Sequence, residues 1–325
     1  MTVESPPNAS PTSPVSVADP RIWNQYHRNR VLHFPVRKIL KSDTRIFAMG
    51  SCFAMEIRRA LQARGRIVYP DYPSVSYDGA SQVFDKIPHS RDALQHYDTF
   101  SMLQEFEAAL GVWADRSAGY WSVTNAPVNK ILNSPEVFQD PYRKLVYAAT
   151  RPSLENLCES ITQVIRQGLD SANVIVLTLG LTEVWQHNGT GRHLCKPPGT
   201  GYGGGMGNAT FRQSTFLENY ENMRKLLDLV FARYPDKEVI ISVSPVALGE
   251  TFSVFDVGTA NTESKSILRA VAGQICREYE QVQYFPSYEM SMMTAGVFED
   301  DGRHVRPAFA DQIVAAFIGS FSEET

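Results

Sequence analysis

The sequence predicts an α/β fold: a doubly wound, flavodoxin-like sheet of about five parallel strands with helices on both faces, plus an inserted segment. In three places an amphipathic stretch of helical length is followed by a short apolar run, and an apolar run near residue 46 precedes another such stretch. Strands that alternate with helices in this way form parallel sheets with right-handed crossovers. Ligands bind beyond the carboxyl ends of such strands, so reactive residues are sought there.

The first strand and helix lie around a Gly50-Ser-Cys52 turn. Ile46-Phe-Ala-Met49 is uniformly apolar, as in a strand buried on both faces. The apolar face of the helix that follows comprises Phe53, Ile57, Ala60 and Leu61. Ser51 therefore lies at a helix N-terminus, where backbone N–H groups and the helix dipole stabilise negative charge. It is a candidate nucleophile, although serine is also a common N-cap.

The remaining elements are expected in a simple alternation. A second strand is predicted at 66–70, a long loop at 71–95, a helix at 97–113 and an insertion, a small hairpin or a cap, at about 115–150. The helix–strand pairs follow at 153–169 and 173–180, 215–234 and 238–245, and 264–279 and 282–286, before a last helix at 307–321. Pro307 suits the first position of that helix.

The ends and loops of the chain set its domain organisation. Residues 1–20 are rich in Pro, Ser and Thr and are predicted to be a disordered tail. Residues 21–325 are predicted to form one domain. The Gly-rich stretch at 186–210 does not join a strand to a helix as a phosphate-binding loop would. It is therefore interpreted as a mobile loop near the rim of the sheet where the strands have their carboxyl ends and ligands bind.

Composition narrows the class of protein. The chain has 325 residues, 43% of them hydrophobic, a net charge of −4 and a pI near 6.0, which argues against nucleic acid as a partner. No apolar run approaches the ~20 residues of a membrane span, and the N-terminus lacks the features of a secretory signal. The four cysteines lack CxxC spacing, so reduced thiols and a cytoplasmic location are expected.

A base and its partner are available near the C-terminus. A serine nucleophile needs a base within hydrogen-bond reach and an acid that orients the base. His304 follows the last predicted strand and precedes the last helix, and Asp301 stands three residues earlier. An Asp-x-x-His turn can hold the carboxylate against the imidazole, but solvated surface loops carry the same pattern.

Other strand ends supply further candidates for the same rim. Gly180 and Thr182 follow a predicted strand and could donate to an oxyanion, with Glu183 next to them, and Ser244 ends another strand. Cys52 adjoins Ser51, but a buried structural thiol is the simpler interpretation of that residue. The histidines in the Gly-rich region lack a zinc pattern, so no metal and no cofactor are expected.

The order of these elements resembles the SGNH, or GDSL-like, hydrolase superfamily. The string Phe47-Ala-Met-Gly-Ser-Cys-Phe-Ala54 matches the motif that names the GSCFA family of bacterial proteins. Thr178-Leu-Gly-Leu-Thr-Glu-Val-Trp185, Val243-Ser-Pro-Val246 and Ser264-Lys-Ser-Ile-Leu-Arg269 are similar to later blocks of that family. The resemblance covers about residues 44 to 320.

The resemblance implies one SGNH-like domain and a set of roles. Ser51 would be the nucleophile, His304 the base and Asp301 its partner. The superfamily's Gly-x-Asn-Asp reads Gly180-Leu-Thr-Glu183 here, so Thr182 stands where an asparagine donates to the oxyanion. The other oxyanion donors would be the backbone N–H of Ser51 or Cys52 and, less securely, Gly79, at the position of the superfamily's second-block glycine.

The expected function is that of a serine esterase acting on an O-acyl ester through a Ser-His-Asp triad. By analogy with the superfamily, the substrate would be a small molecule or carbohydrate that carries an acetyl group. An acyltransferase with the same triad and a catalytically inactive glycan-binding protein are the alternatives. The sequence does not indicate the alcohol, the acyl length or the oligomeric state.

Overall fold

The computed structural model describes residues 23, 32, 34–76, 94–113, 115–200 and 203–322. The predicted tail at residues 1–20, most of the predicted loop at 71–95 and Gly79 lie outside them. Within this part of the chain, no helix is both long enough and apolar enough to cross a membrane.

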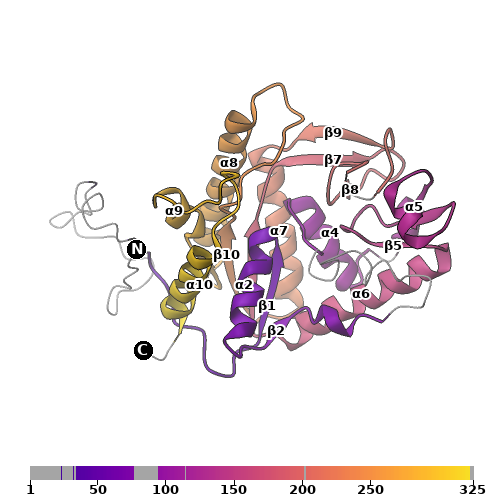
Figure 1. Ribbon diagram of the computed structural model, residues 1–325. Coiled ribbons are helices and arrows are strands. Elements are labelled where there is room, and N and C mark those ends of the chain that lie inside the picture. The colour runs from indigo at the N-terminus through magenta and orange to yellow at the C-terminus, as the bar shows by residue number, and fades with distance from the viewer. Residues whose placement is uncertain are drawn as a thin grey trace.

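A five-stranded parallel sheet forms the centre of the protein (Figure 1). Its strands are β1 (Ile46–Gly50), β2 (Val68–Tyr69), β6 (Val174–Leu179), β10 (Glu238–Val243) and β11 (Val282–Tyr284). Their order across the sheet is β11-β10-β6-β1-β2. Numbered by first appearance in the chain this is 2-1-3-4-5, the flavodoxin-like order. The predicted fold class is confirmed.

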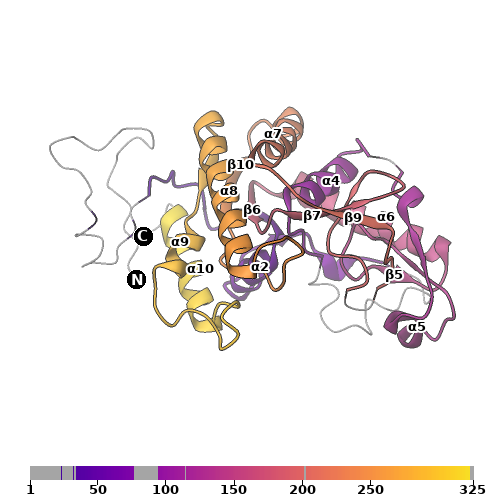
Figure 2. The same cartoon turned by 90° about the horizontal axis from the view of Figure 1, so that it is seen from above.

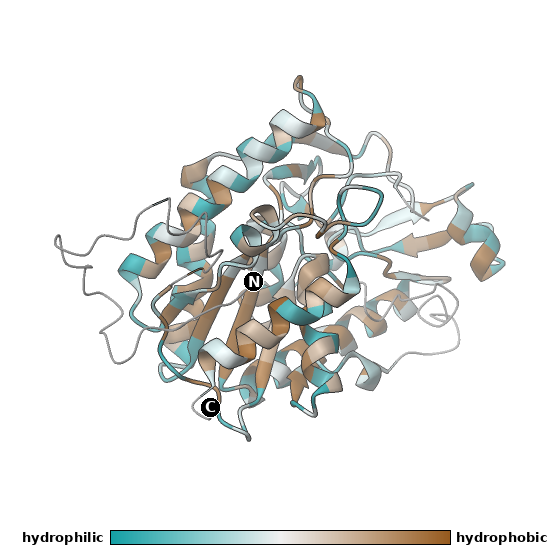
Figure 3. Ribbon diagram, turned by 60° about the vertical axis from the view of Figure 1, so that its left-hand side comes forward, coloured by the Kyte–Doolittle hydropathy of each residue, from teal (hydrophilic) through white to brown (hydrophobic). Residues whose placement is uncertain are grey.

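Side chains on alternate positions of each strand face two different helical layers. In β1, Phe47 and Met49 join one core and Ile46 and Ala48 the other. The first layer contains α4 (Thr99–Ala109), α6 (Arg151–Ser171), α7 (Phe216–Arg233) and α8 (Val257–Glu278). The second contains α2 (Cys52–Ala63), α9 (Ser287–Met292) and α10 (Pro307–Phe321). Because both faces are covered, the strands are apolar along their length, and they are brown in Figure 3.

The start of α8 differs from the prediction. The helix begins at Val257, seven residues before the predicted start at 264, and the Asp256 carboxylate caps it by accepting from the N–H groups of Gly258 and Thr259. Only Ala260 is buried in the extra turns, so this segment carries no apolar periodicity that the sequence could display.

Two small antiparallel sheets lie together on the side of the molecule away from α9 and α10 (Figure 1 and Figure 2). The predicted insertion forms β3 (Trp121–Val123), α5 (Pro127–Leu132), β4 (Val137–Gln139) and β5 (Tyr147–Ala148), preceded by the short 3-10 helix η4 (Ser117–Gly119). The other sheet has the order β8-β7-β9, from β7 (Glu183–His187), β8 (His193–Leu194) and β9 (Ala209–Gln213). Another 3-10 helix, η1 (Tyr72–Ser74), follows β2. The prediction of a continuous loop at 186–210 is therefore wrong in part, because β7 pairs with a strand more than twenty residues away.

A buried ionic cluster ties the insertion to α4. The Glu105 carboxylate is fully buried and accepts from the guanidinium of Arg143, at 3.0 Å from Nε, and from Arg116 at 3.4 Å. Burial alone would raise the pKa of Glu105, but Arg116 and Arg143 outweigh it and hold that pKa far below its usual value. The carboxylate is therefore ionised, and its charge is compensated inside the protein.

Replacing Glu105 by Gln should reduce the free energy of unfolding by ~3–5 kcal/mol, because two buried guanidinium groups are then left to share the single carboxylate of Asp140. Urea denaturation at pH 7 measures this. The pKa is lowered on folding, so the contribution is present above the unfolded value of 4.5 and is lost as the pH falls below it. The difference in free energy of unfolding between wild type and variant should therefore become smaller as the pH falls below 4.5.

The control is Glu218→Gln, since the ion pair of Glu218 with Arg212 leaves a third of each side chain exposed. Glutamine can keep the capping box of α7, so this variant should lose less than ~1 kcal/mol. Equal losses in the two variants would contradict a special role for the buried cluster.

Candidate active site

Strand β1 ends in a close approach to β6 that only glycine permits. Gly50 has a φ of +141° and pairs with Thr178 in the register of the two strands. A Cβ at Gly50 would overlap the carbonyl oxygen of Thr178. The chain can therefore turn directly from the sheet edge into α2, with Ser51 as the first residue beyond the strand.

Thr178 holds the backbone and the hydroxyl of Ser51. The N–H of Ser51 donates to the carbonyl of Thr178 at 3.2 Å and to its hydroxyl at 3.0 Å, and the two hydroxyls lie 3.2 Å apart. The oxygen of Ser51 also accepts from the N–H of Phe53 at 3.3 Å, as an N-cap does. The capping interpretation and the nucleophile hypothesis are thus compatible in one geometry.

The free backbone donor beside Ser51 belongs to Cys52. The N–H of Ser51 is occupied by Thr178, whereas the N–H of Cys52 has no acceptor among the residues that the structure describes. It lies in the first turn of α2, where the helix dipole favours negative charge. Of the two predicted backbone donors to an oxyanion, the geometry favours Cys52.

Three of the predicted rim residues meet at one small cavity. Ser51, Gly180 and Ser244 line a space of about 70 Å³ beyond the ends of β1, β6 and β10. A Cβ at Gly180 would lie 3.2 Å from the Cβ of Ser51 and 2.5 Å from the carbonyl oxygen of Tyr97. Gly180 therefore leaves room for the serine at this edge.

The other residues of the Gly180 turn face different partners. Thr182 is buried, its N–H donates to the hydroxyl of Ser264 at 2.9 Å, and it does not line the cavity of Ser51. Glu183 accepts from the hydroxyl of Thr251 and from the N–H of Phe252 at 3.1 Å. The arrangement gives Thr182 no contact with the serine and makes Glu183 an anchor for the loop before α8.

Asp301 and His304 form a pair on a short hairpin. The N–H of Glu299 donates to the carbonyl of His304, and Nδ1 of His304 lies 2.5 Å from a carboxylate oxygen of Asp301. The backbone N–H of Arg303 and the imidazole lower the pKa of Asp301 well below its usual range. The carboxylate is ionised, so Nδ1 carries the proton and Nε2 is left as an acceptor.

The hairpin touches the serine cavity through Arg303 instead of His304. Arg303 lines that cavity and donates from Nε to the carbonyl of Ala247 at 3.2 Å. The side chain of His304 is half exposed, and between it and Ser51, both in the described part of the chain, there is no hydrogen bond. The structure thus brings the Asp301–His304 hairpin to the serine cavity through Arg303, without a hydrogen bond between the imidazole and Ser51.

A buried lysine joins the loops behind the cavity. Nζ of Lys265 donates to the carbonyls of Gly180 at 2.6 Å and Val246 at 2.8 Å. Burial, with a smaller contribution from the nearby charge of Arg303, lowers the pKa of Lys265 to about 7. The sequence carried a signal for it, since Lys265 falls in phase with the buried residue Leu268 on the apolar face of α8.

Cys52 points into a polar network that the sequence did not predict. Its sulfur lies 3.6 Å from Oε1 of Gln95 and 3.7 Å from the hydroxyl of Tyr97. Lys144, from the insertion, donates to the same two oxygens at 3.0 and 2.7 Å. The network fixes the Tyr97 segment, whose carbonyl accepts from the N–H groups of Gly180 and Leu181.

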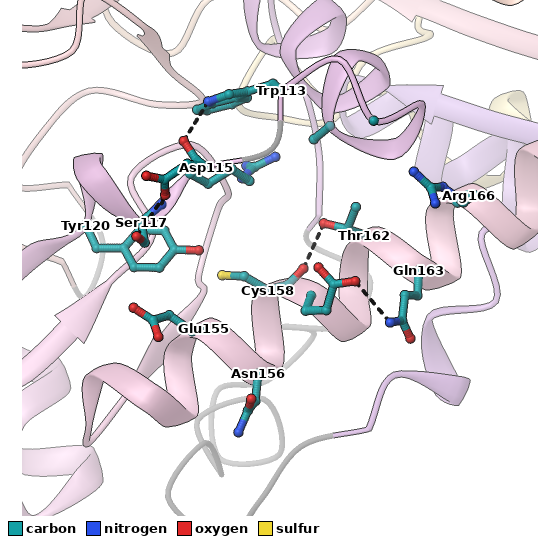
Figure 4. Close-up of a pocket in the computed structure, with 14 residues that line it drawn as sticks. Trp113, Asp115, Ser117, Tyr120, Glu155, Asn156, Cys158, Thr162, Gln163 and Arg166 are labelled. Carbon is teal, nitrogen blue, oxygen red and sulfur yellow. Dashed lines mark hydrogen bonds between the residues drawn. The ribbon is translucent and has the colours of Figure 1, made fainter.

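A separate cavity of about 540 Å³ lies over α6, and Figure 4 shows the residues that line it. It shares no lining residue with the serine cavity. Its polar groups are bonded to one another: Trp113 donates to the carbonyl of Asp115 at 2.8 Å, and Ser117 donates to the Asp115 carboxylate at 2.9 Å. The predicted site residues do not converge here.

The histidines of the Gly-rich region are engaged in packing. Nε2 of His187 accepts from the indole of Trp121 at 2.8 Å, and the ring of His193 packs on Phe100. Burial lowers the pKa of His193 to about 4. Within the described ranges, no group of three His, Cys, Asp or Glu residues is arranged to hold a metal ion.

Comparisons with known proteins give one substantial match. The family model described as the GSCFA family covers residues 45–317. No curated protein matches the chain. One solved structure, described as a crystal structure, aligns with 46% of this chain and 64% of its own at 17% identity, with a TM-score of 0.29. A likeness that low carries no argument, and it spans less than two thirds of that other chain.

Replacing Lys265 by Met should change how stability depends on pH. The unfolded amine keeps its proton up to its ordinary pKa of 10.5, whereas the folded amine keeps it only up to about 7. Between these values the unfolded state binds more protons, so the contribution of Lys265 to the free energy of unfolding rises with pH. Each pKa unit of difference corresponds to ~1.4 kcal/mol. Between pH 7 and 10, the free energy of unfolding of the wild type should therefore rise by up to a few kcal/mol relative to that of the Met variant.

Denaturant titrations at pH 7, 8.5 and 10 measure this difference. Lys225→Met, at an exposed position of α7, removes the same charge without a buried amine and should track wild type. Parallel pH curves for wild type and both variants would contradict a titrating Lys265.

Proposed function

The chain belongs to the GSCFA family, and on that premise we propose that it is a serine hydrolase of the SGNH type that cleaves O-acyl esters with Ser51 as nucleophile. The observation that carries the proposal is the setting of Ser51: at a helix N-terminus, beside the free N–H of Cys52, in a cavity against which the Asp301–His304 hairpin packs through Arg303. In this proposal the hairpin supplies the base and its orienting acid to the cavity that holds the nucleophile and the oxyanion donor.

The reaction would proceed in two steps. Oγ of Ser51 attacks the ester carbonyl and passes its proton to Nε2 of His304, while the carbonyl oxygen becomes an oxyanion next to the N–H of Cys52. The ester C–O bond then breaks, and the alcohol leaves with the proton from His304. Water attacks the acyl-enzyme in the second step, which releases the acid and restores Ser51.

The Asp301 pair prepares His304 for this role. The carboxylate fixes the tautomer with the proton on Nδ1 and stabilises the imidazolium that forms during attack. The mechanism requires the imidazole to move into contact with Ser51, since the two are not hydrogen bonded in the free protein. Such contacts commonly tighten only when substrate is bound.

Labelling with a fluorophosphonate, followed by peptide mapping, tests the proposal. We expect an adduct on Ser51 of the wild type and none in Ser51→Ala. His304→Ala should slow labelling by ~10³-fold or more, because no other group takes the proton. Asp301→Asn should slow it by ~10²–10⁴-fold, because the imidazole loses its fixed tautomer.

Asp300→Asn is the matched control. Asp300 is exposed, pairs with Arg306 and makes no contact with the imidazole, so its variant should be labelled at the wild-type rate. If folded wild type carries no adduct on Ser51, or if the adduct forms equally fast without His304, the hydrolase proposal fails and a binding role on this fold becomes the better interpretation.

A further inference from the structure

The serine cavity adjoins a larger one. A space of about 420 Å³ shares part of its wall with the cavity of Ser51. The shared residues are Cys52, Tyr97, Leu181, Leu248, Gly249 and Arg303. A volume of this size is that of a small-molecule site, and it greatly exceeds what a two-carbon acyl group fills.

Most charged and polar groups of the larger cavity already have partners in the protein; among the described residues, the indole N–H of Trp185 and the carboxylate of Glu250 have none. The Glu183 carboxylate holds Thr251 and the N–H of Phe252, as described above. Nζ of Lys196 donates to the carbonyl of Thr200 at 2.6 Å. The Asp98 carboxylate caps α4, and the Tyr97 hydroxyl is bonded to Gln95 and Lys144. A ligand therefore finds few unsatisfied polar groups in this wall.

Apart from Glu250, Arg303 and the thiols of Cys52 and Cys195, the remaining lining is apolar. It is formed by Leu181, Trp185, Leu194, Pro197, Leu248 and Phe252. The rings of Trp185 and Phe252 meet edge to face, with centroids 5.1 Å apart, and Phe211 supports both at 5.5 and 5.9 Å. Contacts among the three rings thus hold the aromatic part of this wall in place.

The loop that carries Phe252 leaves apolar side chains exposed. Phe252 is 42% exposed, and Val254 and Phe255 follow it in the same loop at 96% and 50%. Glu183 fixes the start of this loop through Phe252. Of these three side chains only Phe252 lines the cavity, so its exposed ring is the one placed to meet an apolar ligand.

We infer that the larger cavity is an acyl-binding site, which makes the enzyme selective for esters of medium-length apolar acids over acetate esters. This rests on the proposed function, since the acyl carbonyl must lie at Ser51. Every methylene placed against the apolar wall adds to binding free energy, and a two-carbon group at Ser51 has only Leu181 and Leu248 of that wall beside it, since these two also line the serine cavity. A sugar is disfavoured there, because it would need the polar groups that the protein has already satisfied.

Two alkyl fluorophosphonates, one with an ethyl and one with an octyl chain, test the inference. On wild type the octyl probe should label Ser51 at least ~10-fold faster than the ethyl probe. In Phe252→Asp, which puts a charge into the apolar wall at a half-exposed position, the ratio of the two rates should fall several-fold towards one. Because both probes react with the same serine, the ratio of their rates cancels any effect of the substitution on the reactivity of Ser51.

Phe255→Asp is the matched control, because Phe255 is in the same loop and equally exposed but does not line the cavity. It should keep the wild-type ratio. A wild-type ratio near one, or an equal fall of the ratio in both variants, would overturn the inference.

A binding measurement separates this inference from the proposed function. By calorimetry, octanoate should bind wild type and bind Phe252→Asp at least ~10-fold more weakly, whereas acetate should bind neither. If Ser51 is never labelled but octanoate binding follows this pattern, the hydrolase proposal fails and the apolar site stands. If octanoate does not bind wild type, the acyl-site inference fails even where Ser51 is labelled.

Discussion

The hydrogen bonds between Thr178 and Ser51 are the constraint on which the candidate site depends. They join the ends of two neighbouring parallel strands at the point where one chain leaves the sheet for a helix. Gly50 makes the approach possible, because any other side chain there would overlap Thr178. The same contact occupies the N–H of Ser51, which is why the proposed mechanism assigns the oxyanion to the N–H of Cys52.

Hydrogen bonds from distant segments hold the turn after β6, next to this contact. Lys265 draws the carbonyls of Gly180 and Val246 together from behind, and Tyr97 accepts from the Gly180 turn in front. The β6 turn is thus held on both sides by groups from distant segments. A serine in such a setting cannot drift far from its rotamer, which is the preorganisation that a catalytic site requires.

The large sheet could be predicted because β6 and β10 are uniformly apolar and each follows a long amphipathic helix. The small sheets could not, because β3, β4, β5 and β8 are only two or three residues long and β7 pairs with β9 across more than twenty residues. In the site, the Asp301–His304 pair is a local pattern and was visible in the sequence. The contacts of Thr178 and Lys265 span 127 and 85 residues, so only the fold reveals them.

Arg303 and His304 are consecutive residues of one hairpin, and this couples two properties that are usually treated apart. Arg303 is fastened to the carbonyl of Ala247 and forms wall in both adjoining cavities. A displacement of the hairpin backbone towards Ser51 would therefore also move that wall. In the proposed mechanism, a substitution that shifts Arg303 would then change both the shape of the cavity and the position of the imidazole.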